Sequence, residues 1–183
     1  VFHLYMEKFD EKTREELLSY IKAGTDDRIF AVAQLLRLGC NVQQIAFETK
    51  IDGFFLEKMK KIIEMENMLK ANPWNRDVLH EAKRGGFSDR AVAWLWNTDE
   101  DTVFRIRKEM HLFPVYKMID TCASEFDSYV PYFYSTYEEE NESIAEDRKK
   151  ILVLGSGPIR IGQGVEFDYS TVHAVKTIRN AGY

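Results

Sequence analysis

The part of the sequence that could handle phosphate chemistry is a glycine-rich loop at residues 155–164. An apolar run at 150–154 precedes the loop and is consistent with a buried parallel strand. A helix is predicted after it, from about 168 to 180. Backbone amides at the start of such a helix can bind an anion. Strand, loop and helix together indicate the start of a Rossmann-like unit, and the loop residues of interest are Gly155, Gly157, Arg160, Gly162, Gln163 and Gly164.

The loop matches neither of the two standard phosphate-binding patterns. A dinucleotide fingerprint has a third glycine three residues after the second. Counted from Gly157, that position holds Arg160, and Pro158 stiffens the turn. The Gly-Lys-Ser/Thr of a nucleotide triphosphate loop is also missing. An anion site stays open, but a sharply folded connection that needs small residues for close packing is favoured.

A second chemical possibility is nucleic-acid binding through residues 87–108, which have the cadence of a helix-turn-helix. The second helix carries Arg105, Arg107 and Lys108. A reading helix needs base-contacting residues near its N-terminus, whereas residues 99–101 are all acidic and would repel phosphate. The net charge of −5 also argues against a nucleic-acid partner. A packed helical hairpin is favoured, and a helix-turn-helix module is kept as the alternative function.

Composition excludes several other classes of site. Cys40 and Cys122 are too few for a four-cysteine zinc site, and the four histidines show no helical pairing. We therefore predict neither a metal nor a cofactor in this chain. No apolar run approaches the roughly 20 residues of a membrane span, so no membrane partner is expected. Residues 1–5 do not look like a signal peptide, and we expect a cytoplasmic segment.

Start and stop signals predict a helical domain over residues 1–112, whose recognisable helices begin after Asp10. Predicted N-caps are Asp10, Asp26 or Asp27, Asn41, Asp52, Asn75, Ser88 and Thr98, and predicted ends are Gly24, Gly39, Pro73 and Gly85–Gly86. The longest helix spans 53–71 and is apolar on more than one side. Because such a helix must be covered by something, we predict self-association through Phe54, Phe55, Met59, Ile63, Met65 and Met68.

Two stretches of the helical domain look alike. Residues 39–61 and 86–108 match at an offset of 47 residues, with glycines, caps and core positions recurring together. Each reads as glycine, short helix, turn and longer helix. A true duplication and a chance match between amphipathic helices are both open. The predicted fold is mainly α, with two small helical subdomains.

Residues 113–149 are predicted to form a connection. Short extended segments at 115–119 and 132–136 are rich in strand-forming residues, and an acidic run follows at 138–142. The density of tyrosine and phenylalanine is too high for a flexible linker. Two roles are equally open for these aromatic side chains: packing on a neighbouring surface, or completing the local core. Residues 150–183 would then form a truncated start of a further domain, because no second parallel strand follows the last helix. We expect the chain to be a fragment.

Four segments resemble carbamoyl-phosphate synthetase large subunits. Residues 151–169 are similar to the opening of the second synthetase half of that family, and residues 114–126 to the segment before it. Residues 134–140 and 51–56 resemble the same family in the same order. The resemblance thus covers most of the chain and is more specific than any single glycine loop.

The resemblance implies a division of roles. Residues up to about 149 resemble the helical oligomerisation domain between two ATP-grasp halves, and residues from about 150 open a pre-ATP-grasp domain. The parent would be an ATP-dependent ligase of arginine or pyrimidine synthesis. It makes carbamoyl phosphate from bicarbonate, two ATP and ammonia that a small glutaminase subunit supplies, with Mg²⁺ or Mn²⁺ and K⁺. This chain alone would be a catalytically inactive assembly module. The loop containing Gly162, Gln163 and Gly164 would lie near the passage that carries carbamate.

Overall fold

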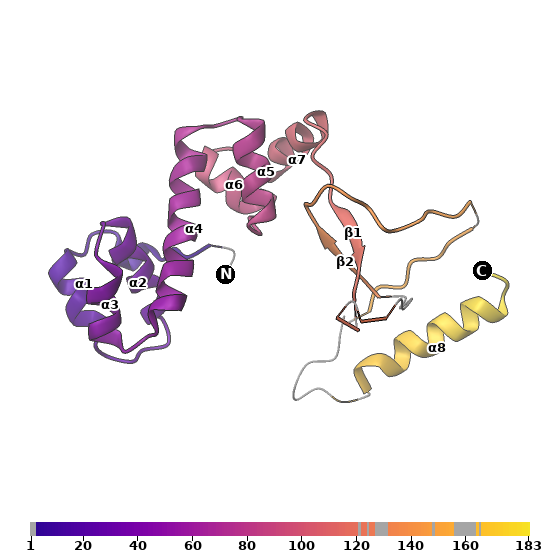
Figure 1. The fold of residues 1–183 in the computed structure, drawn as a ribbon, viewed down its shortest axis with the longest axis horizontal. Coiled ribbons are helices and arrows are strands. Elements are labelled where there is room, and N and C mark those ends of the chain that lie inside the picture. Colours follow the sequence, from indigo (N-terminus) through magenta and orange to yellow (C-terminus); the bar gives the residue numbers. More distant parts are fainter. Residues whose placement is uncertain are drawn as a thin grey trace. The chain divides into compact units, whose positions relative to one another are not determined.

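The computed structural model describes residues 3–120, 122–123, 125–126, 132–147, 149–155, 164 and 166–183. The described residues divide into two compact units, Val1–Ser143 and Ile144–Tyr183. The first unit is mainly helical (Figure 1) and ends in a small antiparallel sheet. The predicted mainly α fold is thus confirmed.

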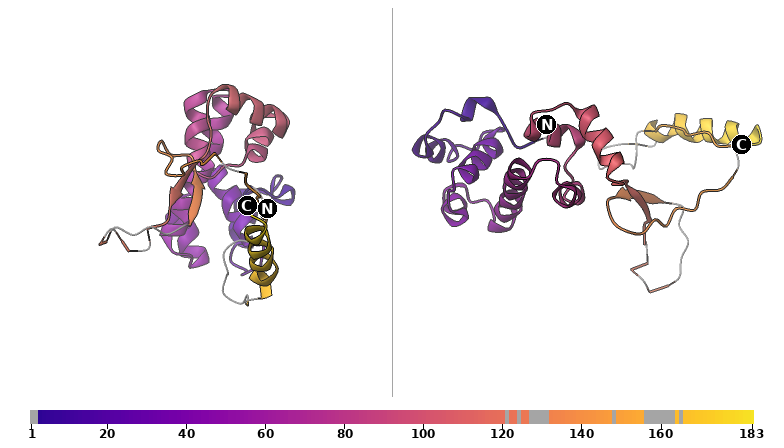
Figure 2. Two further views of the ribbon diagram at one scale, coloured as in Figure 1. Left: turned by 90° about the vertical axis from the view of Figure 1, so that its right-hand side faces the viewer. Right: turned by 90° about the horizontal axis from the view of Figure 1, so that it is seen from above.

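The helical part holds one short 3-10 helix and seven α-helices. In chain order they are η1 (Glu7–Phe9), α1 (Arg14–Tyr20), α2 (Arg28–Arg37), α3 (Val42–Thr49), α4 (Gly53–Ala71), α5 (Arg76–Arg84), α6 (Asp89–Trp96) and α7 (Glu100–Glu109). Two groups of helices are visible, and α4 passes from one to the other (Figure 1). The right-hand view in Figure 2 shows the helical region from above.

Most predicted caps are found where the sequence placed them. The side chains of Asn41, Asp52, Asn75 and Ser88 each accept a hydrogen bond from a backbone amide of the helix that follows. Three predicted caps and one predicted end are wrong. Asp27 stands at the N-cap of α2, but its side chain makes no capping bond, and α1 ends at Tyr20, before Gly24. Thr13, not Asp10, caps α1 in a reciprocal capping box with Glu16, and Asp99, not Thr98, caps α7. In both cases another acceptor stands three residues before the amide that needs it.

Each helical group has its own apolar core. The first core gathers α1, α2, α3 and the first half of α4, and includes Leu17, Val32, Ile45 and Leu56. The second gathers the end of α4 with α5, α6 and α7, and includes Leu69, Leu79, Val92 and Val103. Helix α4 is therefore apolar on several sides because two separate cores need it.

The two groups contain equivalent modules. We call residues 28–61 the first module and 76–108 the second module. At the 47-residue offset, the buried residues Val32, Ile45 and Leu56 stand where Leu79, Val92 and Val103 stand. The N-caps Asn41 and Asp52 likewise correspond to Ser88 and Asp99.

The turns of the two modules also correspond in backbone geometry. Gly39 and Gly86 both have positive φ, +73° and +88°. After each glycine the same helix-ending hydrogen bond forms. In the first module Cys40 N–H donates to Leu35 C=O, and in the second Phe87 N–H donates to Ala82 C=O. The next turn uses a left-handed residue in both modules, at Lys50 and Asn97. The backbones of the two modules diverge where α4 continues and α7 ends.

The connection contains the predicted pair of extended segments as a hairpin. Strands β1 (Val115–Met118) and β2 (Phe133–Thr136) pair antiparallel, with Val115 opposite Thr136 and Met118 opposite Phe133. Outside the strands, Ile119 N–H donates to Tyr132 C=O at 2.9 Å. The residues between the strands are described only in part.

In the second unit, helix α8 (Glu166–Asn180) forms as predicted, but the strand predicted at 150–154 does not. Leu152 and Leu154 are 85% and 87% exposed. A parallel strand needs a neighbour to pair with, and among the described residues only β1 and β2 pair. The apolar run therefore has no partner strand among the residues that the structure describes.

Candidate functional site

The most exposed large apolar side chains of the helical region lie at the corner between α3 and α4. Phe47, Phe54 and Phe55 are 70%, 61% and 60% exposed. The Asp52 cap starts α4 one residue before Phe54, so both phenylalanines fall in its first turn, where few helix neighbours cover them. Their rings meet edge to face with centroids 5.4 Å apart. Aromatic side chains left in water in this way are typical of an interface.

Lysine side chains accompany these rings. The Lys50 ammonium lies 4.3 Å from the centroid of Phe47, and that of Lys58 lies 5.1 Å from the centroid of Phe54. Cation–π contacts of this length are attractive. The corner is therefore an apolar surface with positive charge along it, which we call the aromatic corner: Phe47, Lys50, Phe54, Phe55 and Lys58.

The six residues predicted for self-association do not share one surface. Phe54, Phe55 and Met68 are exposed. Met59 and Met65 are partly buried, each packed against one of the two cores. Ile63 is 3% exposed and belongs to the first core, so its side chain is not available to a partner. The sequence analysis did not include Phe47 among the residues predicted for self-association. The 47-residue offset could have drawn attention to it, because its equivalent in the second module is also aromatic, Trp94.

The predicted loop residues are mostly outside the described part of the chain. Gly157, Arg160, Gly162 and Gln163 fall there. Gly164 is half-buried. At Gly155, a Cβ would come within 3.1 Å of Thr171 Oγ1 on α8. At Gly155, this close approach favours the interpretation that the loop needs small residues for close packing.

The second module holds a buried cluster of three charged side chains. Lys83 closes α5, Asp89 opens α6, and Arg107 lies in the last turn of α7. Lys83 Nζ donates to Asp89 Oδ1 at 2.8 Å, and Arg107 Nε and Nη2 donate to Asp89 Oδ2 at 3.1 and 3.0 Å. All three side chains are about nine-tenths buried. We call them the ion cluster.

Backbone carbonyls satisfy the remaining donors of the ion cluster. Lys83 Nζ donates to Phe87 C=O at 2.7 Å, and Arg107 Nη1 donates to Leu112 C=O at 2.8 Å. Burial pushes the pKa of the Asp89 carboxyl up, but the bonds and charges of Arg107 and Lys83 outweigh burial. The pKa of Asp89 therefore lies below its ordinary value. The cluster thus joins the ends of three helices through charged side chains in which every nitrogen has an acceptor.

The ion cluster also receives the connection. The ring of Tyr137, just after β2, lies 5.1 Å from Lys83 Nζ and 5.6 Å from Arg107 Cζ. The Tyr137 carbonyl is 3.2 Å from His80 Nε2. Burial raises the pKa of the Tyr137 hydroxyl, and Arg107 opposes that rise. Of the aromatic residues of the connection, Tyr137 is therefore packed on the second module, whereas Tyr132, Phe133 and Tyr134 are exposed.

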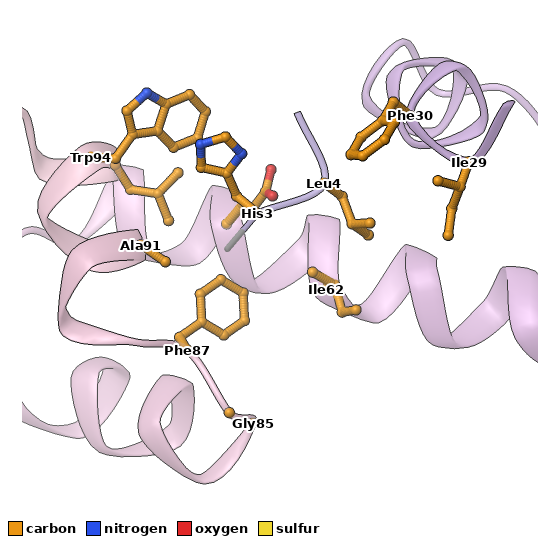
Figure 3. A pocket seen from close by; sticks show the side chains of 12 residues that line it. His3, Leu4, Ile29, Phe30, Ile62, Gly85, Phe87, Ala91 and Trp94 are labelled. Carbon is orange, nitrogen blue, oxygen red and sulfur yellow. The ribbon is translucent and has the colours of Figure 1, made fainter. Parts of the chain in front are cut away.

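A pocket of about 400 Å³ lies where the two helical groups meet. Figure 3 shows His3 beside Trp94, Ile62 on α4, and Phe87 on the loop after α5. The His3 and Trp94 rings stack with centroids 4.6 Å apart. The one acidic wall residue, Glu66, is bound by Arg37 through two bonds of 3.0 and 2.9 Å. The other residues that line the pocket are mostly apolar. No lysine or arginine is among them, so the pocket is poorly suited to bind a phosphate.

Nothing in the geometry favours the nucleic-acid alternative. Arg107, one of three cations counted on for phosphate binding, is 6% exposed and bonded to Asp89. The start of α7 is acidic, as the sequence indicated. Within the described ranges, no three His, Cys, Asp or Glu side chains gather as a metal site. None of the helices described has the length and apolar character that crossing a membrane requires.

Comparison with protein families gives two matches. Residues 1–111, more than half of the chain, match the model of the carbamoyl-phosphate synthetase large chain oligomerisation domain. Residues 147–183 match the carbamoyl phosphate synthase preATP-grasp domain. The two matches follow one another in the order in which the helical unit and the β-loop-α segment were predicted.

Proposed function

The chain belongs to the carbamoyl-phosphate synthetase large-chain family, and we propose that its aromatic corner holds copies of that large subunit together. The observation that carries the proposal is the exposure of Phe54 and Phe55 within a region that matches an oligomerisation domain. The chain supplies assembly, through the helical region, and connection, through residues 113–149, to the preATP-grasp segment.

Comparison between the modules supports the aromatic corner as the assembling surface. The positions equivalent to Phe54 and Phe55 in the second module hold Asp101 and Thr102. A helix start needs neither ring for its cap, since Asp99 caps α7 without them. The two phenylalanines are therefore unnecessary for the local fold, and burial by a partner would account for them.

The experiment is a measurement of mass in solution. Sedimentation equilibrium of the chain should give a dimer or a higher species at micromolar concentration. Phe54→Ser combined with Phe55→Ser should weaken association at least about tenfold, as loss of a central aromatic pair does. Phe104→Ser, which removes an exposed ring from the second module, is the matched control and should change little. A wild-type monomer at high micromolar concentration would contradict the proposal.

For the parent we propose the glutamine-dependent ligase reaction, with ATP, Mg²⁺ or Mn²⁺ and K⁺ bound elsewhere in the subunit and a small glutaminase subunit as partner. Cytoplasmic location and a role in arginine or pyrimidine synthesis go with it. The described carboxylates do not cluster as ligands of Mg²⁺, so no step of ATP chemistry is assigned to them. The chain alone should not hydrolyse ATP when bicarbonate is added. Activity above a buffer control, in a preparation free of other enzymes, would contradict this.

The loop around Gly164 is proposed to border the carbamate passage in the complete subunit. Gly164→Phe should then lower carbamoyl phosphate formation while bicarbonate-dependent ATP hydrolysis persists. Gly164→Ala separates bulk from backbone conformation, because alanine adds a Cβ with little volume. Equal loss of both partial reactions in the phenylalanine variant, or an equally damaged alanine variant, would mean that the loop is structural.

A further inference from the structure

The ring of Tyr137 lies over the ion cluster of the second module, and the first module has a hollow at the equivalent place. Tyr137 lies over Lys83 and Arg107, close enough to Asp89 for that charge to affect its pKa. At the 47-residue offset these three positions are Leu36, Lys60 and Val42. All three line one hollow of about 300 Å³, together with Gly39, Cys40, Asn41, Gln43 and Glu57. We call it the first-module hollow.

The chemistry of the first-module hollow suits a tyrosine. Leu36 and Val42 are buried core residues and form an apolar floor for a ring. Lys60 offers a cation at the position of Arg107, and Glu57 offers an acceptor for a hydroxyl proton. Tyrosine combines an apolar body with one polar tip. Phenylalanine would leave Glu57 without that donor.

We infer that the first-module hollow receives a tyrosine from the hairpin of a second copy of this chain. The inference rests on the proposed self-association and names a contact within it. Two tyrosines, Tyr132 and Tyr134, are exposed on β2 and the residue before it. They are two residues apart in an extended segment, so their side chains share a face. Tyr116, opposite Ser135, lies on the other face.

The hairpin of the same chain is held elsewhere, which points to a second copy. Its next aromatic residue, Tyr137, is fixed on the second module by His80, Lys83 and Arg107. Charge supports the same partner. The first half of α4 carries Lys58, Lys60 and Lys61, whereas Glu138–Glu140 follow the hairpin and are exposed. Bringing the hairpin of one copy to α4 of another would place opposite charges together.

A contact of this kind is reciprocal in a two-fold dimer. The hollow of each copy would meet the hairpin of the other, so every dimer would contain the contact twice. Removing either side in all copies therefore deletes two contacts at once. Such a contact is testable by pairing a variant of the hollow with a variant of the hairpin.

The test uses sedimentation velocity of the whole chain in four forms. Lys60→Asp alters the hollow, and Tyr132→Ser with Tyr134→Ser alters the hairpin. Each should weaken association about tenfold, and the combined variant should be hardly weaker than either alone, because both remove the same contact. Lys108→Asp, the equivalent of position 61 on α7 of the second module, and Tyr116→Ser, on the other hairpin face, are the matched controls. Circular dichroism melting shows that each variant is folded.

The outcomes separate this contact from self-association itself. Coupled losses in the hollow and hairpin variants support the contact. Additive losses, or losses equal to those of the two controls, would overturn it. If the hollow and hairpin variants associate normally while Phe54→Ser with Phe55→Ser does not, the hollow inference is wrong and the proposed function stands. A wild-type chain that stays monomeric would remove both.

A second measurement identifies the neighbour directly. Chains with Gln43→Cys are mixed with chains with Tyr134→Cys, both without Cys40 and Cys122 through substitution by serine. A disulfide between two different chains after mild oxidation places the hairpin in the hollow of a partner. A chain that carries both new cysteines and closes the bond within itself at high dilution would overturn the second-copy occupant.

Discussion

The first and second modules share a backbone plan and differ in what stabilises the place where three helices meet. In the first module, Leu36 and Val42 are buried among other apolar side chains. The equivalent positions of the second module hold Lys83 and Asp89, joined by Arg107. The caps, the left-handed turn residues and the core positions are alike. The same helical plan therefore accepts either an apolar or an ionic junction.

The difference shows what the charges add. Burying ions removes their hydration, and a buried ion pair is often no more stabilising than apolar residues of similar size. The ion cluster instead gives the second module a surface of two cations on which Tyr137 lies. Among the described residues, no ring lies in the first-module hollow. In this molecule the ionic junction goes with attachment of the connection.

The largest effect is expected when one member of the ion cluster is removed. Asp89→Asn leaves Lys83 and Arg107 buried without a counter-charge, and should destabilise the second module by about 3–5 kcal/mol. Urea unfolding followed by tryptophan fluorescence measures this, because Trp74, Trp94 and Trp96 all belong to the second helical group. The first-module counterpart, Val42→Ala, should cost only about 2 kcal/mol by circular dichroism. Equal losses would show that the ionic junction is not special.

Replacing all three residues of the ion cluster should stabilise the second module, whereas removing one of them destabilises it. Lys83→Leu and Asp89→Val copy the first-module residues Leu36 and Val42, and Arg107→Met removes the third charge. With all three changes, the stability of the second module should rise by between nothing and about 4 kcal/mol. The connection should loosen, because Tyr137 loses both cations. A glutamate-specific protease should then cleave residues 138–140 faster than in the wild type. Unchanged cleavage would mean that Tyr137 is held without the charges.

The helix-ending glycines should respond alike in the two modules. Gly39→Ala and Gly86→Ala each force an L-residue to φ near +73° or +88°, although a Cβ meets nothing within 4 Å at either site. Each should cost about 1 kcal/mol in thermal or urea unfolding. Gly53→Ala is the control, because its φ is not positive and its Cβ also meets nothing. A cost at Gly53 as large as at Gly39 would exclude the backbone explanation.

The smallest effect is expected in mild acid. The folded-state pKa of Asp89 is lowered, so the stability it contributes is complete above the ordinary pKa of 3.8 and is lost as pH falls through the lowered value. As pH falls below about 4, tryptophan-monitored stability of the second module should therefore begin to fall. Asp89→Asn should remove that part of the slope. A wild-type slope that persists in the variant would assign the acid sensitivity to other carboxyls.

Local signals predicted the helical region well because they act over a few residues. Asn41, Asp52, Asn75 and Ser88 are short polar side chains that bond the first free amides of a helix, wherever that helix later packs. The errors have the same origin. Asp10 and Thr98 are residue types that often cap helices. The caps are instead Thr13 and Asp99, whose side chains accept from the amides three residues later, those of Glu16 and Thr102.

Sequence reasoning did less well at the candidate sites. Three cations in 105–108 suggested a basic helix, and only packing showed that Arg107 faces inward to Asp89. The ion cluster joins residues that are far apart in the chain, so no local sequence pattern predicts it. Similarly, the predicted strand at 150–154 has a strand's composition, yet pairing depends on other strands that no residue within the run can supply.

By itself the sequence determined the mainly α fold, the helix ends near Gly39, Pro73 and Gly85–Gly86, the 47-residue correspondence and the family resemblance, since each depends on residue type and short spacing. Tertiary structure alone decided which side of α4 serves which core, why Ile63 is buried while Phe54 and Phe55 are exposed, and where Tyr137 lies. Exposure is decided by which surfaces remain after distant helices have packed, and charge pairing by which side chains that packing brings within hydrogen-bond distance.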